Sequence, residues 1–255
     1  FENYRSQNRN FPYTITLATS GKRKMRKIEK IEKHLKESKN SEHIINGIKA
    51  ILANFPIGSG IASLMSDYIP SQRELRLMEF TENIARDLSD LKNEINENYL
   101  KSDEYAFIFE KCFKGAVENY QKEKIIAFRA VLINSLIEFD ITQTEKEYYL
   151  NLVDSLSLLH IQILSFLAFP KKYLELKGLD ESTVSGGFSS FFPKVIPEAN
   201  IEIIKLAFKD LHNYGFTNTD SGIFNTMTSS SGWSLLGDRV SKNGRNFIKF
   251  ISLNK

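Results

Sequence analysis

Residues 144–169 read TEKEYYLNLVDSLSLLHIQILSFLAF. Apolar residues recur through this segment at spacings of three and four, which is the period of an α-helix that buries one face. Pro170 follows, and a helix usually ends at or before the residue that precedes a proline. We therefore predict one continuous core helix from about Thr144 to Phe169. Its predicted inward residues are Leu152, Val153, Leu156, Leu159, Ile163, Leu164 and Leu167.

Helical spacing also dominates the chain upstream of this segment. It recurs in residues 22–35, 44–55, 61–68, 71–99, 103–120 and 125–139. The predicted fold class is mainly α, with a helical bundle over residues 22–177 that contains one long helix. Residues 1–21 form an N-terminal arm, in which alternation over residues 13–18 is typical of a short strand.

The longest predicted helix begins at Ser71-Gln72-Arg73-Glu74, which has the form of a capping box, and reaches about Tyr99. Its apolar residues alternate between spacings of three and four, which gives a narrow seam of the kind that packs against another helix. That helix lies in the same chain or in a second copy, so we predict self-association as one use of the seam. The candidate partner interface consists of Ile84, Leu88, Leu91 and Ile95.

Composition places the chain among ordinary globular proteins. The 255 residues are 42% hydrophobic and 25% charged with a formal net charge of +3, unlike disordered, collagen-like or membrane-spanning chains. Cys112 is the only cysteine, which excludes an internal disulfide and a cysteine-cluster zinc site and suits a reducing compartment. Its apolar helical neighbours predict a small buried side chain rather than a nucleophile. We predict a cytoplasmic protein.

The sequence carries no catalytic or cofactor-binding motif. The four histidines lack a second ligand at the spacing of a metal site. One of them, His160, falls on an apolar helix face, which predicts a neutral, hydrogen-bonded core histidine. Gly58-Ser59-Gly60 lacks the third glycine and the preceding strand of a dinucleotide site. We therefore predict a protein without enzymatic activity and without a metal or other cofactor.

Positive charge is concentrated near the start of the chain. Residues 1–40 hold 11 Lys and Arg against 4 Glu, a net charge of +7. A basic run within them suits contact with phosphate, with an anionic lipid surface or with an acidic protein, and such runs are also common on solvated helix faces. The run comprises Lys22, Arg23, Lys24, Arg26 and Lys27.

Two apolar segments raise the question of membrane contact. The charge-free residues 155–169 are fewer than the ~20 that a spanning helix needs. Residues 44–69 carry Lys49 and Asp67 and are interrupted at Phe55-Pro56, which favours a buried helical hairpin. Insertion of this hairpin beside the basic arm is the alternative, and it would make the protein a membrane-active helical effector.

Composition changes near Gly178. Residues 1–177 contain 5 glycines, whereas residues 178–255 contain 8 together with Ser, Gly and Thr clusters. We place a domain boundary there and predict a tail over residues 178–255. Its one clear helix spans Glu198 to Tyr214 with Gly215 as its C-terminal cap, and Ser241 caps a last helix or strand.

Aromatic residues in the tail have two interpretations each. Phe188, Phe191 and Phe192 either pack at the domain junction, which we favour, or form an interaction lid. Trp233 is the only tryptophan. It is a candidate anchor for a partner, because tryptophan is enriched at binding hot spots, and it is also a candidate plug that seals the tail against the bundle.

Two segments resemble known kinds of protein. The first is carried by Phe55-Pro56-Ile57-Gly58-Ser59-Gly60 with Ile69-Pro70, Arg73, Arg76-Leu77 and Glu79-Phe80. It resembles a segment of uncharacterised bacterial helical proteins, a likeness that implies no activity.

The second likeness covers about 60 residues of the tail. A helix ending at residues 210–216, a Gly/Ser-rich segment and then residues 240–248 resemble the end of a winged-helix domain. The resemblance implies a small α+β domain with the Glu198–Tyr214 helix in the place of the recognition helix. It also implies a basic wing side that contacts nucleic acid through Arg239, Lys242, Arg245 and Lys249.

Charge on the predicted recognition helix favours a protein partner over DNA. Glu198, Glu202 and Asp210 accompany Lys205 and Lys209, and such a mixture does not attract phosphate. We therefore predict a non-enzymatic interaction or effector protein that binds a macromolecular partner through its tail. The alternatives are a DNA-binding regulator that uses the wing and the membrane-active effector described above.

Overall fold

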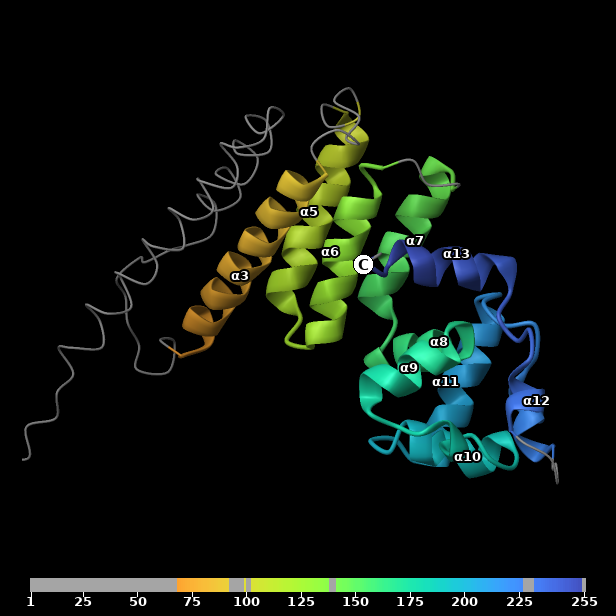
Figure 1. Ribbon diagram of the computed structural model, residues 1–255. Coiled ribbons are helices and arrows are strands. Elements are labelled where there is room, and N and C mark those ends of the chain that lie inside the picture. Colours follow the sequence, from red (N-terminus) through yellow and green to blue (C-terminus); the bar gives the residue numbers. More distant parts are fainter. Residues whose placement is uncertain (1–67, 92–98, 100–101, 138–140, 227–231, 254–255) are drawn as a thin grey trace, which may run out of the picture. The chain divides into compact units, whose positions relative to one another are not determined.

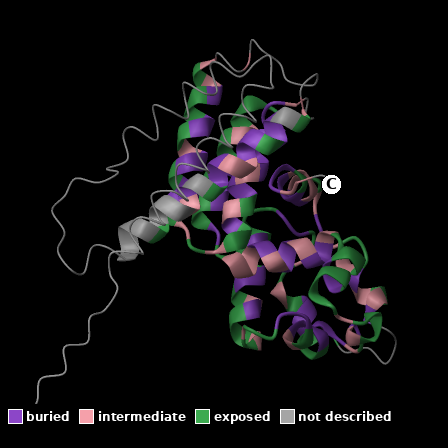
Figure 2. Cartoon of the chain, turned by 60° about the vertical axis from the view of Figure 1, so that its left-hand side comes forward, coloured by how far each residue is buried: buried purple, intermediate pink, exposed green. Residues whose placement is uncertain are grey.

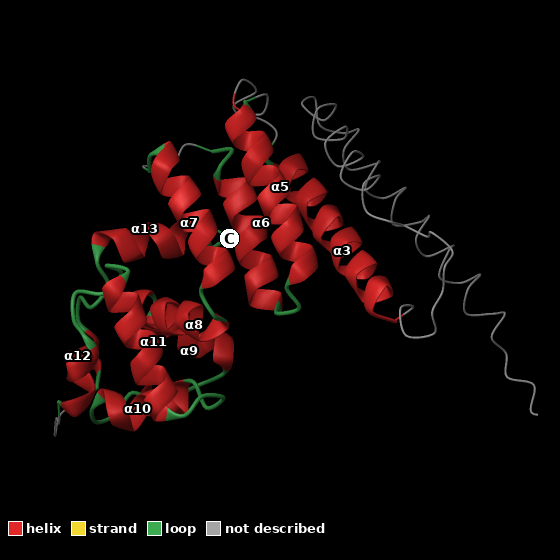
Figure 3. Ribbon diagram, turned by 180° about the vertical axis from the view of Figure 1, so that it is seen from behind, coloured by secondary structure: helices red, strands yellow, loops and turns green. Residues whose placement is uncertain are grey.

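The computed structural model describes residues 68–91, 99, 102–137, 141–226 and 232–253 (Figure 1). These residues form helices joined by loops, without a β-strand (Figure 3). The mainly α class is therefore confirmed. The chain divides into two units, residues 1–93 and 94–255.

In the first unit the structure describes one helix, α3 (Tyr68–Asp90). It begins before the predicted capping box, so Ser71 lies inside the helix, and it ends well short of Tyr99. An Asp side chain competes with helical hydrogen bonds, so Asp90 favours an end at this point.

Three described helices of the second unit pack against one another, α5 (Asp103–Glu118), α6 (Lys122–Asn134) and α7 (Gln143–Ser155) (Figure 1). Ser102 caps α5, because its hydroxyl accepts a hydrogen bond from the Tyr105 N–H at 3.1 Å. Thr142 and Glu145 form a capping box at the start of α7. Side-chain caps thus fix where two of the three helices begin.

The single helix predicted over residues 144–169 is wrong. Leu156 and Ser157 are extended, and they separate α7 from α8 (Leu158–Ala168). The Nδ1 atom of His160 accepts a hydrogen bond from the Ser157 N–H at 3.2 Å, which stabilises a new helix start. The apolar spacing continues across the break because both helices bury one face, so periodicity alone conceals it (Figure 2).

The remaining helices are short and closely connected. They are α9 (Pro170–Lys177), the 3₁₀ turn η1 (Glu181–Thr183), α10 (Phe188–Val195), α11 (Ile201–Asn213), the 3₁₀ turn η2 (Ser221–Asn225), α12 (Trp233–Leu236) and α13 (Lys242–Phe250). Gly215 follows α11 with a φ of 72°, as its predicted capping role requires. Ser241 caps α13, which is a helix rather than a strand.

The predicted α+β tail is not found. Between α11 and α13 the described residues make a single antiparallel bridge, Thr217 with Val240, and no hairpin strands. The Asn218 side-chain amide donates to the Asp238 and Val240 carbonyl oxygens, each at 3.3 Å. The backbone also holds this bridge, because the Asn218 N–H donates to the Arg239 carbonyl oxygen at 2.8 Å and the Ser241 N–H donates to the Phe216 carbonyl oxygen at 3.0 Å.

The tail helices pack on helices that precede the predicted boundary at residue 178. Helix α8 contacts both α11 and α13, and α13 also contacts α6. The side-chain amide of Asn134 in α6 donates to the carbonyl oxygens of Phe250 at 2.8 Å and Ser252 at 3.0 Å, which satisfies acceptors at the end of α13. The division of the chain at residue 178 stays a prediction.

Two aromatic clusters fill the core of this part. In the first, Phe188, Phe192 and Phe224 surround Phe208 of α11, with ring centroids 5.3–6.4 Å from it. Phe188, Phe191 and Phe192 are fully buried, so they pack in the core and form no lid. In the second, Phe247 of α13 stacks on Phe216 at 4.7 Å.

Candidate interaction surfaces

Helix α11 is positioned by its N-terminal cap and by its inner face. The side-chain oxygen of Asn200 accepts a hydrogen bond from the Ile203 N–H at 3.0 Å, which satisfies one of the free donors at the helix start. The spacing of residues 201, 204, 208 and 211 predicts an inward stripe; Ile204, Phe208 and Leu211 are each 0% exposed, whereas Ile201 is half-buried. This anchoring holds the outer face of the helix in a fixed orientation.

The outer face of α11 presents large apolar side chains to solvent. Ile203 is 48% exposed and Leu206 is 57% exposed, and their spacing of three places them on one side of the helix. Glu202 and Lys209 are exposed beside them. We call these four residues the α11 outer face.

Sequence reasoning missed this face. The predicted inward stripe consisted of Ile201, Ile204, Phe208 and Leu211, and it assigned no role to Ile203 and Leu206. A helical wheel was the available signal, because it places Ile203 and Leu206 outside the inward stripe.

Three of the four basic residues predicted to contact nucleic acid lie on helix α13. Lys242, Arg245 and Lys249 follow the spacing i, i+3 and i+7, so the structure brings these three together on one side of the helix. Lys242 and Lys249 are exposed, whereas Arg245 forms an exposed ion pair with Asp238. The fourth predicted residue, Arg239, precedes the helix and donates from Nε to the Leu235 carbonyl at 2.7 Å. We call Lys242, Arg245 and Lys249 the α13 basic face.

Trp233 is half-buried and held by contacts inside the chain. Its indole N–H donates to the Glu181 carbonyl oxygen at 3.1 Å, and the Lys171 ammonium lies 5.7 Å from its ring centroid. Lys171 also pairs with the Glu181 carboxylate at 3.2 Å. These contacts join the start of α12 to α9 and η1, an arrangement that favours the plug interpretation over the partner anchor.

Ser157, His160 and Asp210 are connected by polar contacts and are the residue types of a Ser-His-Asp catalytic triad. The Ser157 hydroxyl lies 2.6 Å from Nδ1 of His160, and Nε2 of the same ring lies 3.4 Å from Oδ2 of Asp210. A catalytic base needs a nitrogen reserved for the nucleophile. Here Nδ1 also accepts the Ser157 backbone N–H, and the Asp210 side chain is 55% exposed. The arrangement caps α8 and links it to α11, and we assign it no reaction.

Other chemical groups are also accounted for by packing. Cys112 is fully buried, and burial raises the pKa of its thiol, so the predicted structural role fits its position. His212 donates from Nδ1 to the Thr217 carbonyl oxygen at 3.2 Å. Within the part of the chain that the structure describes, no cluster of His, Cys, Asp or Glu is arranged to hold a metal ion.

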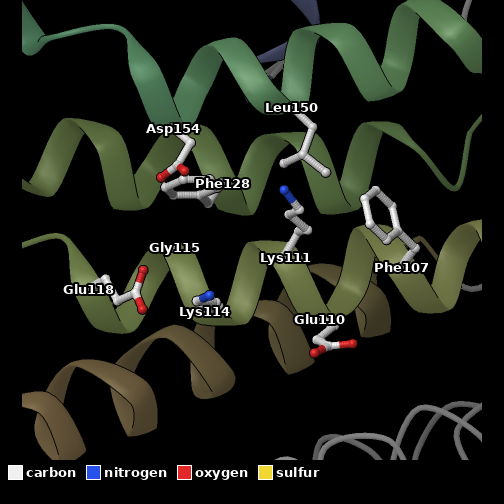
Figure 4. A pocket seen from close by; sticks show the side chains of 9 residues that line it. All are labelled: Phe107, Glu110, Lys111, Lys114, Gly115, Glu118, Phe128, Leu150 and Asp154. Carbon is white, nitrogen blue, oxygen red and sulfur yellow. The ribbon is translucent and has the colours of Figure 1, made fainter.

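A pocket of about 190 Å³ opens between α5, α6 and α7 (Figure 4). Phe107, Phe128 and Leu150 line it, and the Lys111 ammonium donates to the side-chain oxygen of Asn151 at 3.2 Å. Its other charged lining residues have both signs, namely Glu110, Lys114, Glu118 and Asp154. This mixture selects no class of ligand, so we assign the pocket no function.

The remaining predicted residues divide into two groups. Ile84 and Leu88 are buried in α3 and Leu91 is half-buried, whereas Ile95 lies outside the described residues. The partner interface assigned to this seam stays a prediction. The basic run and the N-terminal strand also lie outside the described residues. So does the predicted hairpin over residues 44–69, except for its last two residues, 68 and 69, which begin α3. The basic run comprises Lys22, Arg23, Lys24, Arg26 and Lys27.

No protein-family model matches the sequence, and neither does any curated protein or solved structure. Among the described helices, none combines the length and the apolar character that crossing a membrane requires.

Proposed function

We propose that the protein is a non-enzymatic, cytoplasmic interaction protein that binds a protein partner through the α11 outer face. The observation that carries this proposal is the exposure of Ile203 and Leu206 on a helix whose inner face is fully packed. An exposed apolar pair on a firmly held helix suits helix-mediated protein contact, because burying it removes apolar area from water. Glu202 and Lys209 at its edge suit the polar rim of a protein interface.

Site-specific photo-crosslinking tests this proposal. A photoreactive amino acid placed at residue 206 is expected to give discrete protein adducts in cells that produce the chain. The matched control is residue 176, a leucine on α9 that is 77% exposed. Equal labelling from both positions, or none from residue 206, would contradict a binding role for the face.

A second candidate function is nucleic-acid binding, and the α13 basic face favours it. Three cations on one side of a helix suit contacts to successive phosphates. Lys242 and Lys249 are exposed, whereas Arg245 would first have to leave Asp238. The two lysines are therefore the better contacts.

Salt dependence distinguishes this second candidate. If both lysines contact phosphate, the double change Lys242→Ala and Lys249→Ala reduces the slope of log affinity against log salt by about two. Lys172→Ala, at an exposed lysine on α9, is the control and leaves the slope unchanged. A wild-type chain that fails to bind DNA at low salt removes this candidate.

A further inference from the structure

We infer that the partner of the α11 outer face is a second copy of the same chain, with the two α11 helices antiparallel across a twofold axis. This inference rests on the proposed function, because it names the partner of the same face. It draws on the arrangement of charge around the apolar pair.

The charged residues of the α11 outer face are complementary to those of the same face on a second copy. Glu202 and Lys209 are seven residues apart, so they lie on the same side of α11 about 10.5 Å apart along its axis. In an antiparallel pair whose axis passes midway between them, Glu202 of each copy faces Lys209 of the other. One surface thereby forms two equivalent ion pairs, as a twofold interface requires.

The apolar residues fit the same arrangement. The midpoint between residues 202 and 209 falls beside Leu206, so the two copies of the most exposed residue on α11 that is large and apolar meet at the axis. Ile203 flanks it on the side away from the ion pairs. Burying this pair at the centre and leaving the charges at the rim is the usual anatomy of an interface.

The neighbouring ion pairs leave the arrangement intact. Lys205 binds Oε1 of Glu202 at 3.0 Å, and the Glu202 side chain remains 73% exposed and open to a second cation. Asp210 faces His160 of its own chain and is not needed for the contact. Lys209 is exposed.

Sedimentation equilibrium of the full chain over a concentration series tests the inference. The wild type is expected to dimerise, and Leu206→Asp is expected to be monomeric over the same range. Leu176→Asp changes a more exposed leucine on α9 and should leave the dimer unchanged. A wild type that stays monomeric, or a dimer that survives Leu206→Asp, overturns the inference.

Charge exchange tests the antiparallel register. Glu202→Lys and Lys209→Glu should each raise the dimer dissociation constant about tenfold, because each replaces two attractions by two repulsions. The double exchange rebuilds both pairs and should restore the dissociation constant to within about threefold. Failure of the double exchange to restore the dimer overturns the antiparallel pairing.

A disulfide gives a readout that does not depend on the stability of these variants. Leu206→Cys should form a disulfide-linked dimer on mild oxidation, since the two residues meet at the axis. Leu176→Cys should not, and the native Cys112 is buried. If Leu206→Cys forms no disulfide-linked dimer, the inference is overturned. Adducts to a different protein in the photo-crosslinking experiment would overturn self-pairing and still support the proposed function, whereas no adduct from residue 206 would remove both.

Discussion

Helices α11 and α13 are built alike on the inside and differ on the outside. Each begins at a side-chain cap, Asn200 or Ser241, and each buries phenylalanine in an aromatic cluster. Outside, α11 exposes an apolar pair, whereas α13 carries three cations. The inner faces therefore explain the fold, and only the outer faces distinguish the partners, since an apolar face suits protein and a basic face suits an anion.

Substitutions on the two sides of α11 should separate these roles most strongly. Phe208→Ala is expected to cost about 3–5 kcal/mol, because it leaves a cavity among Phe188, Phe192 and Phe224. Ile203→Ala, on the outer face, is expected to change stability by less than ~0.5 kcal/mol in the monomer. Urea unfolding of both variants, made in the monomeric Leu206→Asp background, measures the difference. An equal loss of stability in the two variants would show that Ile203 is packed inside the monomer and is not part of an available outer face.

The start of α13 should be the next most sensitive point. A Cβ atom at Gly244 would lie 2.3 Å from the Phe216 carbonyl oxygen and 2.9 Å from Cγ1 of Val240. The backbone at Phe216 cannot easily move away from such a Cβ atom, so Gly244→Ala is expected to reduce the free energy of unfolding by about 1–3 kcal/mol. Asn246→Ala, two residues further along the same helix, is the control. A stability equal to that of the wild type would contradict the close packing of α13 on Phe216.

Sequence reasoning predicted the inner faces well, because burial imposes a period that the sequence records. Ile204, Phe208 and Leu211 lie where the spacing places them, and the cap at Ser241 follows from its residue type. The break at Ser157 was missed because the apolar pattern runs through it. A histidine acting as the capping acceptor is also a weak signal compared with Glu or Gln.

The candidate site was predicted only in part. The spacing of Lys242, Arg245 and Lys249 is readable from the sequence, but the ion pair of Arg245 with Asp238 depends on where the chain folds back after α12. The wing was predicted from a likeness to other domains. Among the described residues that segment makes a single bridge, Thr217 with Val240, a pairing between distant residues that no local sequence pattern specifies.

The caps of the two helices differ in the number of hydrogen bonds they make. Asn200→Ala removes one acceptor and is expected to cost ~1 kcal/mol. Ser241→Ala removes an acceptor for the Gly244 N–H and also a donor to the Gly215 carbonyl at 2.6 Å. It should therefore cost more, about 1–2 kcal/mol. Thermal unfolding compares the two, and an equal cost would show that the Gly215 bond adds nothing.

A buried polar link joins α13 to α7, and it makes stability depend on alkaline pH. The Tyr149 hydroxyl donates to Oδ1 of Asn243 at 2.5 Å, so Tyr149→Phe is expected to cost ~1 kcal/mol at neutral pH. Burial, reinforced by Glu145, raises the pKa of Tyr149 from 10.0 to about 12. Because the folded state holds this proton more tightly, its contribution is complete below pH 10 and is lost as the pH rises through 12.

Tyr173→Phe is the matched control for this link. Burial raises the pKa of Tyr173 to about 12 as well, but its buried hydroxyl makes no hydrogen bond to any residue that the structure describes. The change should therefore leave stability at neutral pH nearly unaltered and lessen the loss between pH 10 and 12. Unfolding free energies measured at pH 7 and pH 11 compare both variants with the wild type. A wild type equally stable at both pH values would contradict the assignment.

The corresponding polar link of α11 should matter least. His160 of α8 and Asp210 of α11 approach to 3.4 Å at the surface, where solvent screens the interaction and the Asp210 side chain is 55% exposed. Asp210→Asn retains the size of the side chain and is expected to cost less than ~0.5 kcal/mol at physiological salt. His160→Ala also removes the acceptor for the Ser157 N–H, so it should cost more, ~1 kcal/mol. The double variant should be less stable than His160→Ala alone by at most ~0.3 kcal/mol, because His160→Ala already removes the link to Asp210. A larger Asp210→Asn effect would show that α11 depends on this surface pair rather than on its phenylalanine core.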